Sequence, residues 1–311
     1  MDDEVRKIFQ RQHYKIIGVH SGVKLCHWMR QKLFYGRVCY KEFFYGMQSH
    51  RCLQITPTIS QCTQNCLYCW RYQGATEPYL HIYDEPELIL EEGIKAQRLL
   101  LSGFKGDERC NLKLWRETQE PNHVAISLAG EPTLYPKLGA LIALCNKKGM
   151  TSFLVTNGTV PESLEKLSPL PTQLYITISA PNEIIYKKLC NPIISNGWSK
   201  IKASLEILRS LDTRTVIRHT LVDGWNICNE EQYAKLDCLA EPDFIECKAY
   251  MFVGSSRQRM ALANMPSHTK IKEFAEKLSS LTGYRIAMEK EDSRVVLLTK
   301  KSAKKPISLR S

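Results

Sequence analysis

Apolar and polar positions along the chain follow two alternating periods. Runs of apolar and β-branched residues predict strands at 52–56, 124–128, 152–156, 174–179, 214–222 and 244–253. Apolar residues recur at helical spacing at 85–102, 138–149, 161–167, 199–210 and 229–239, and again at 267–281. Six successive strand–helix units predict an α/β protein with a parallel sheet, either doubly wound or closed into a partial barrel.

The segments that flank these units divide the chain into three predicted parts. Residues 1–51 precede the first strand, residues 52–282 hold the strand–helix units, and residues 283–311 follow them. In the last part, 284–300 (YRIAMEKEDSRVVLLTK) predicts a closing hairpin, and 300–311 (KKSAKKPISLRS) predicts a basic, poorly packed tail.

Composition narrows the location and the partners of the protein. No run of about eighteen apolar residues occurs, and the first residues (MDDEVRKIFQRQ) lack the apolar core of a secretory signal. We therefore expect a cytoplasmic protein without a membrane span. Its 12 cysteines then form no disulfide framework, because the cytosol is reducing. The formal net charge of +11 favours a polyanionic partner.

The segments that follow the strands carry the candidate chemistry, because functional residues of parallel α/β folds collect at the carboxyl ends of the strands. The first strand is followed by a cysteine loop, 60–74 (SQCTQNCLYCWRYQG). The next three are followed by 129–136 (AGEPTLYP), 157–159 (NGT) and 180–182 (APN). Gly-Glu-Pro and Asn-Gly are also ordinary turn sequences, but here they are expected to line one pocket with the cysteines.

Three cysteines of this loop, Cys62, Cys66 and Cys69, have no fourth cysteine nearby in the sequence. A structural zinc site needs four ligands, usually in two halves of CxxC type, and an ordinary [4Fe-4S] cluster needs four cysteines. Three thiolates from one loop would hold three irons of a cube. The fourth iron would stay open for a substrate or a cofactor.

A second set of cysteines, Cys26, Cys39 and Cys52, is spaced evenly as C-x12-C-x12-C. This spacing matches no known zinc signature. Three ligands again suggest a cube with an open iron, and three buried free thiols are the alternative.

The cysteine loop resembles the C-x3-C-x2-C motif of the radical S-adenosylmethionine (SAM) enzymes, with the aromatic Tyr68 just before the last cysteine. The resemblance implies a partial (β/α)6 TIM-like barrel and a [4Fe-4S] cluster whose open iron binds the amino and carboxylate groups of SAM. Reductive cleavage of SAM then gives a 5′-deoxyadenosyl radical that takes a hydrogen atom from the substrate. On the family pattern, Gly130 and Glu131 meet the methionine amino group, and Asn157 and Ser179 are candidates for its carboxylate or the ribose.

Together, the two cysteine sets resemble the tRNA 4-demethylwyosine synthase family. The similarity runs through 27–57, 62–71 (CTQNCLYCWR), 127–136 (SLAGEPTLYP), 154–159 (LVTNGT) and 179–182 (SAPN). It implies two [4Fe-4S] clusters, with the second in the N-terminal part, and a substrate tRNA(Phe) that carries N1-methylguanosine beside the anticodon. Pyruvate supplies two carbons of the tricyclic base.

The family resemblance also bears on electron supply and assembly. The length of the chain is that of archaeal members, whereas eukaryotic members carry a flavodoxin-like domain in front. No flavin phosphate loop is visible in the sequence, so we expect a separate flavodoxin- or ferredoxin-like protein to donate electrons. A monomer is expected for a chain of this size.

Pyruvate could be activated by a lysine that forms a Schiff base, which requires an amine whose pKa is lowered by burial or a neighbouring cation. Lys41 follows Cys39 by two residues, and Lys248 shares a strand face with Glu246 and Tyr250. The open iron of the second cluster could instead chelate pyruvate through its carboxylate and carbonyl oxygens. The two roles are compatible, and the sequence does not choose between them.

RNA binding is expected from cations and planar side chains. These interleave in 28–51, and Arg257 and Arg259 follow the sixth strand. The sequence is also compatible with two other functions. One is another two-cluster radical SAM enzyme that modifies RNA or a peptide. The other is a zinc-stabilised RNA-binding module without catalysis, which the absence of a second CxxC half disfavours.

Overall fold

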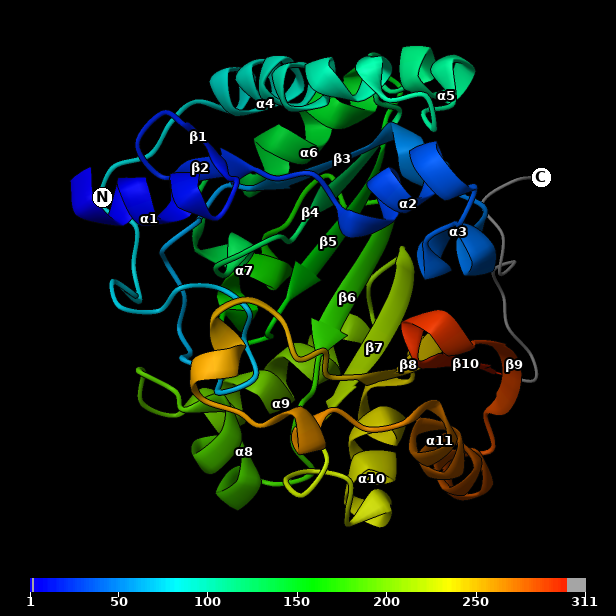
Figure 1. Ribbon diagram of the computed structural model, residues 1–311. Helices are drawn as coiled ribbons and strands as arrows, with labels where there is room; N and C mark the ends of the chain where they lie inside the picture. Colours follow the sequence, from blue (N-terminus) through cyan, green and yellow to red (C-terminus); the bar gives the residue numbers. More distant parts are fainter. Residues whose placement is uncertain (2, 301–311) are drawn as a thin grey trace.

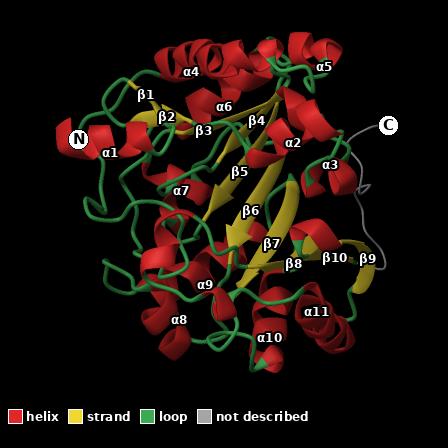
Figure 2. Cartoon of the chain, viewed as in Figure 1, coloured by secondary structure: helices red, strands yellow, loops and turns green. Residues whose placement is uncertain are grey.

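The computed structural model describes residue 1 and residues 3–300, and these form one sheet of ten strands with helices packed around it (Figures 1 and 2). The strands are β1 (Lys15–Ile17), β2 (Ser21–Val23), β3 (Cys52–Thr56), β4 (His123–Ile126), β5 (Thr151–Thr156), β6 (Gln173–Thr177), β7 (Arg214–Leu221), β8 (Phe244–Ala249), β9 (Arg285–Lys290) and β10 (Val295–Thr299). The helices are α1 (Asp3–Arg11), α2 (His27–Tyr35), α3 (Tyr40–Tyr45), α4 (Pro86–Leu101), α5 (Leu112–Glu117), α6 (Leu138–Lys147), α7 (Pro161–Glu165), α8 (Glu183–Cys190), α9 (Gly197–Leu208), α10 (Glu230–Ala240) and α11 (His268–Thr282).

Strands β3 to β8 pair in parallel and in sequence order, each joined to the next through helical segments. This confirms the predicted partial (β/α)6 barrel. The first strand lies at 52–56 as predicted, but the strand predicted at 244–253 ends at Ala249. Its neighbour β7 stops at Leu221, which pairs with Ala249, so the following residues have no strand to pair with.

Antiparallel strands extend both edges of the barrel sheet. The predicted C-terminal hairpin is present as β9 and β10, and β10 pairs with β8. At the other edge, β2 pairs with β3 and β1 with β2, an extension that the sequence pattern did not predict. These two strands have three residues each, too few for an alternating pattern to be recognised. All of the predicted basic tail except Lys300 lies outside the described residues.

The inner face of the barrel is partly filled by the short helix α3. Its side chains Tyr40, Phe44 and Tyr45 pack against Phe153 and Tyr175 in one buried cluster. These contacts occupy the amino-terminal halves of the strands, so polar residues farther along the inner face are left beside a cavity. No helix in the described part of the chain is long and apolar enough to cross a membrane.

One buried pair links the sheet to the outer helices. His219 on β7 and Asp237 on α10 are both fully buried, and Nε2 of the histidine lies 3.0 and 3.1 Å from the two carboxylate oxygens. Replacing Asp237 with Ala leaves the ring without this partner. A buried polar group that loses its partner is costly because water cannot replace the lost contact.

We predict that Asp237→Ala lowers the free energy of unfolding by about 3–5 kcal/mol, as measured by chemical denaturation. Asp237→Asn should cost less because its side-chain oxygen still accepts a hydrogen bond. The control is Glu183→Ala, which removes the exposed partner of Lys187 and should change stability by less than about 1 kcal/mol. Equal effects of Asp237→Ala and Glu183→Ala would contradict a stabilising role for the buried pair.

Candidate active site

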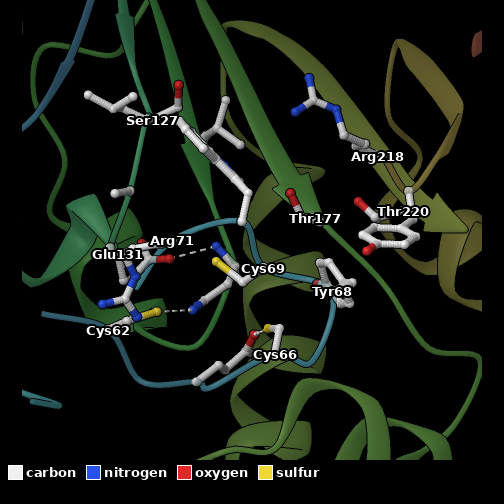
Figure 3. Close-up of a pocket in the computed structure, with 18 of the residues that line it drawn as sticks. Cys62, Cys66, Tyr68, Cys69, Arg71, Ser127, Glu131, Thr177, Arg218 and Thr220 are labelled. Atoms are coloured by element: carbon white, nitrogen blue, oxygen red, sulfur yellow. Dashed lines mark hydrogen bonds between the residues drawn. The ribbon is translucent and has the colours of Figure 1, made fainter. Parts of the chain in front are cut away.

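A cavity of about 480 Å³ opens at the carboxyl ends of the barrel strands and continues along the inner face (Figure 3). Figure 3 shows Cys62, Glu131 and Ser127 on one wall, with Arg218 and Thr220 on the opposite one. The structure thus brings most of the predicted site residues into a single cavity. Those that line it are Cys62, Cys66, Tyr68, Cys69, Gly130, Glu131, Asn157 and Lys248.

The cysteine loop is locked against the Gly-Glu-Pro turn by backbone contacts. The amide of Glu131 donates to the carbonyl oxygen of Gln61 at 2.8 Å. Gly130 has φ of +69°, and a Cβ atom added there would lie 1.6 Å from the carbonyl oxygen of Thr58. Only glycine fits this position, because any side chain would both strain the backbone and collide with the loop.

The Glu131 carboxylate is held rigidly at this turn. It is 1% exposed and accepts hydrogen bonds from Thr133 Oγ1 at 2.6 Å, Thr156 Oγ1 at 2.6 Å and the amide of Asn157 at 2.7 Å. Burial raises its pKa, and these hydrogen bonds partly oppose the rise. Oε1 also accepts from the amide of Thr133 at 3.0 Å, whereas Oε2 accepts only from the amide of Asn157. A fixed carboxylate with room for another donor at Oε2 suits an ammonium group.

Asn157 and Tyr68 make contacts within the protein around the cysteines. The side-chain amide of Asn157 donates to Thr63 Oγ1 at 2.9 Å and lies 3.8 Å from the sulfur of Cys62. The Tyr68 hydroxyl donates to Ser179 Oγ at 2.7 Å. Ser179 lies in a small adjoining hollow rather than on the main cavity wall. The roles of these residues toward SAM stay predictions.

The thiols of the cysteine loop lie beside a buried cation that sequence reasoning missed. Burial raises the pKa of Cys62 to about 12, and Arg71 opposes this rise. Arg71 is 1% exposed and binds the carbonyl of Ser60 and the hydroxyl of Thr76. Its position two residues after the last motif cysteine could have indicated from the sequence that it lies near the thiols. A buried guanidinium here stabilises negative charge on the thiolates.

Arg259, for which RNA contact stays a prediction, also holds the cysteine loop in place. Its guanidinium donates to the carbonyl oxygens of Leu67, at 3.2 Å, and Cys69. Arg257 is exposed, donates to the carbonyl of Phe252 at 3.1 Å and packs over that ring. Arg257 is therefore the more accessible of the two arginines to a bound RNA.

The second cysteine set also comes together. Cys26 and Cys39 precede the first turns of α2 and α3, and Cys52 begins β3. Burial raises the pKa of all three thiols, that of Cys39 to about 12. Neighbouring cysteines of the set raise the pKa of Cys39 and Cys52 further. Backbone N–H groups at the starts of α2 and α3 oppose this rise for Cys26 and Cys39, as expected where helix amino termini face sulfur.

Both cysteine sets have the donor chemistry of an iron–sulfur cluster. Within residues 3–300, no three Cys, His, Asp or Glu side chains converge in the way that ligands of a single metal ion do. The ligands of a [4Fe-4S] cluster stand farther apart, because each thiolate binds a different iron. Assignment of the six cysteines as cluster ligands stays a prediction.

A layer of charged side chains lies between the two cysteine sets. Lys248 and Arg218 line the cavity, and Lys41 has its Nζ 4.6 Å from the ring centre of Tyr175 and 5.0 Å from that of Phe153. Burial, and secondarily the charge of Arg218, lowers the pKa of both lysines to about 8. Lys248 Nζ donates to the carbonyl of Ser293 at 2.8 Å, whereas Lys41 Nζ has no hydrogen-bond acceptor among the described residues.

Comparison with known proteins shows similarity over the whole chain. The family model for the radical SAM superfamily matches residues 56–236, and that for wyosine base formation matches 239–300. The chain is 53% identical to the S-adenosyl-L-methionine-dependent tRNA 4-demethylwyosine synthase of Pyrococcus abyssi, covering 96% of this chain and 89% of the relative. It is 38% identical to the enzyme of the same name from Methanocaldococcus jannaschii, covering 97% of each chain.

Solved structures give the same result. A structure described as TYW1 with a lysine-pyruvate adduct bound superposes with a TM-score of 0.88 at 39% identity, covering 97% of both chains. A crystal structure of archaeal TYW1 superposes with a TM-score of 0.83 at 35% identity, covering 99% of this chain and 100% of that one. Since both the sequence and the fold match over their full extent, the chain belongs to the tRNA 4-demethylwyosine synthase family of the radical SAM superfamily.

Proposed function

We propose that this enzyme joins pyruvate to N1-methylguanosine beside the anticodon of tRNA(Phe) and so forms 4-demethylwyosine, the tricyclic precursor of wyosine bases. One observation carries the proposal: a single cavity is lined by the three motif cysteines at one end and by Lys248 and Arg218 at the other. SAM activation and pyruvate binding can therefore take place within one space. The names of the relatives and the lysine-pyruvate adduct of the solved structure support the same reaction.

At the cysteine end, the chain would hold a [4Fe-4S] cluster with Cys62, Cys66 and Cys69, and SAM with the neighbouring turns. Glu131 would accept a hydrogen bond from the methionine amino group, and Gly130 leaves room for the close approach of the cysteine loop. Tyr68, Asn157 and Ser179 complete the proposed SAM-binding set. When bound, the cluster and SAM supply the 5′-deoxyadenosyl radical that takes hydrogen from the N-methyl group.

At the other end, residues 1–51 would form an extension whose Cys26 and Cys39, with Cys52 at the start of the barrel, hold a second [4Fe-4S] cluster. The barrel would comprise 52–282, and 283–311 its C-terminal hairpin and tail. Lys41 lies close enough to all three thiols to lower their pKa values. A carbonyl substrate bound to Lys41 would therefore lie between the second cluster and the SAM-binding end of the cavity.

Of the two lysines, Lys41 is the better candidate for a Schiff base with pyruvate. Its amine is without a hydrogen-bond acceptor in the described structure and lies against aromatic rings, whereas that of Lys248 is engaged with Ser293. Lys248 would act as a second catalytic residue that holds the keto acid or moves a proton. An amine in a largely apolar setting is more readily neutral, and only the neutral amine attacks a carbonyl.

RNA would approach the cavity near Trp70. Tyr14 stacks on this ring with centroids 6.1 Å apart, and Lys24 Nζ lies 4.9 Å from both rings. Trp70 lines the cavity, and stacked aromatics with a cation suit an unstacked base. We further propose a cytoplasmic monomer that receives electrons from a flavodoxin- or ferredoxin-like protein.

Iron and sulfide analysis of anaerobically purified protein tests the two-cluster proposal. We predict about eight irons in the wild type and about four in each triple Cys→Ala variant, one of Cys62, Cys66 and Cys69 and one of Cys26, Cys39 and Cys52. Only the first variant should lose formation of 5′-deoxyadenosine from SAM. About four irons in the wild type that vanish in the first variant would contradict a second cluster.

Borohydride trapping tests the choice of lysine. Incubation with pyruvate and borohydride should add a reduced pyruvate adduct to the peptide that contains Lys41, detected by mass spectrometry. Lys41→Ala and Lys41→Arg should both lose the adduct, because a guanidinium forms no imine under these conditions. Lys248→Ala should retain it at Lys41. An adduct found on the Lys248 peptide of the wild type would reverse the assignment.

A further inference from the structure

Arg218 stands on the cavity wall with one edge of its guanidinium unused. Its Nε donates to Glu246 Oε2 at 3.0 Å and its Nη2 to the Tyr40 hydroxyl at 2.8 Å. Among the described residues, none of the hydrogen bonds of this side chain uses Nη1. The side chain is 14% exposed, and it lines the cavity. It therefore has N–H donors left for a molecule in the cavity.

The guanidinium is fixed in this position by its surroundings. Arg218 and Glu246 are register partners on β7 and β8. Glu246 is fully buried and also accepts hydrogen bonds from Tyr45 Oη at 2.7 Å and Tyr40 Oη at 3.3 Å. The plane of the guanidinium packs over Tyr175, with Cζ 4.6 Å from the ring centre. A planar cation held on three sides is prepared to bind a carboxylate on the fourth.

The charged side chains around the cavity also favour binding of an anion. Lys41 and Lys248 both lie within electrostatic reach of Arg218 and Glu246. The other carboxylate near Lys248, Asp292, is paired with Arg37 and Lys290, so three basic side chains share Glu246. Thr177 and Thr220, the register neighbours of Arg218 and Lys248 respectively, add hydroxyl groups to the same wall. A small keto acid would supply the missing negative charge, and a neutral carbonyl compound would not.

We infer that Arg218 binds the carboxylate of the 2-oxo acid through its free edge and thereby makes the site select keto acids over neutral carbonyl compounds. This inference rests on the proposed function, since it presupposes that a lysine of the cavity condenses with pyruvate. Arg218 acts before the covalent step: it holds the carboxylate while the amine attacks the keto carbon and water leaves, giving an iminium. The open iron of a second cluster would be the competing carboxylate ligand.

The test compares two carbonyl probes that differ in charge. Pyruvate and its neutral methyl ester are each titrated against intact, cluster-loaded enzyme with borohydride, which reduces the iminium to a stable amine that is counted by mass spectrometry. In Arg218→Gln, half-maximal trapping should need at least about tenfold more pyruvate, the loss expected for one charge-assisted hydrogen bond. The requirement for methyl pyruvate, which reports only the effect of the lost charge on the lysine amine, should change several-fold less than that for pyruvate.

Two further variants keep the test decisive. Arg218→Lys retains the positive charge without the fork, so it should show an intermediate shift for pyruvate alone. The matched control is Arg214→Gln. Arg214 is a buried arginine on the same face of β7 that donates to Gln173 and packs over Tyr45 and Phe244, away from the cavity lining. This substitution should leave the ratio of the two requirements unchanged.

Other outcomes would overturn the inference. Equal shifts for pyruvate and its ester in Arg218→Gln would mean that Arg218 acts on the lysine or the fold and not on the carboxylate. No shift for either would place the carboxylate on another ligand, such as an open iron. Absence of any pyruvate adduct in the wild type would instead refute the proposed function, and the inference with it.

Discussion

The buried ion pair between Arg218 and Glu246 holds helix α3 onto the inner face of the barrel. Glu246 is fully buried and receives hydrogen bonds from Tyr40 and Tyr45 of α3 as well as the ion pair from β7. The same helix carries Lys41 and begins just after Cys39. Through the hydrogen bonds of Tyr40 and Tyr45, Glu246 therefore fixes the position of Lys41 and Cys39 relative to the cavity.

Such a pair adds little to the stability of the fold, because the free energy needed to remove two charges from water is about as large as the attraction between them. Its value is electrostatic organisation of the site. Burial, with the charge of Arg218, lowers the pKa of Lys41 and Lys248 to about 8, so that a fraction of each amine is neutral near physiological pH. At the other end of the cavity, burial raises the pKa of Cys62 and a hydrogen bond with Cys190, together with burial, raises that of Cys66, while the charge of Arg71 partly opposes both rises. The cavity thus holds amines of lowered pKa at one end and, at the other, buried thiols beside a cation.

Much of the barrel and one end of the site could be predicted from the sequence. The strands β3 to β8 are rich in apolar and β-branched residues, and the motif cysteines lie within one loop, so both signals are local. The N-terminal elements were missed because β1 and β2 are short and α3 (YKEFFY) is rich in aromatic residues, which are poor helix formers. Arg218 was missed because its partners come from β8 and from α3, far apart in the sequence. Alternating polar residues along 214–222 (RTVIRHTLV) resembled those that identified Lys248 and could have indicated it.

The central claim is that radical formation and pyruvate addition take place in one cavity on one nucleoside. It is tested most directly by giving the reduced wild-type enzyme SAM, pyruvate labelled with ¹³C at its two non-carboxylate carbons, and tRNA(Phe) whose N1-methyl group is fully deuterated. We predict deuterium in the released 5′-deoxyadenosine and both labelled carbons in a tricyclic nucleoside of the digested tRNA, each measured by mass spectrometry. Unlabelled 5′-deoxyadenosine, or a nucleoside without the pyruvate carbons, would contradict it.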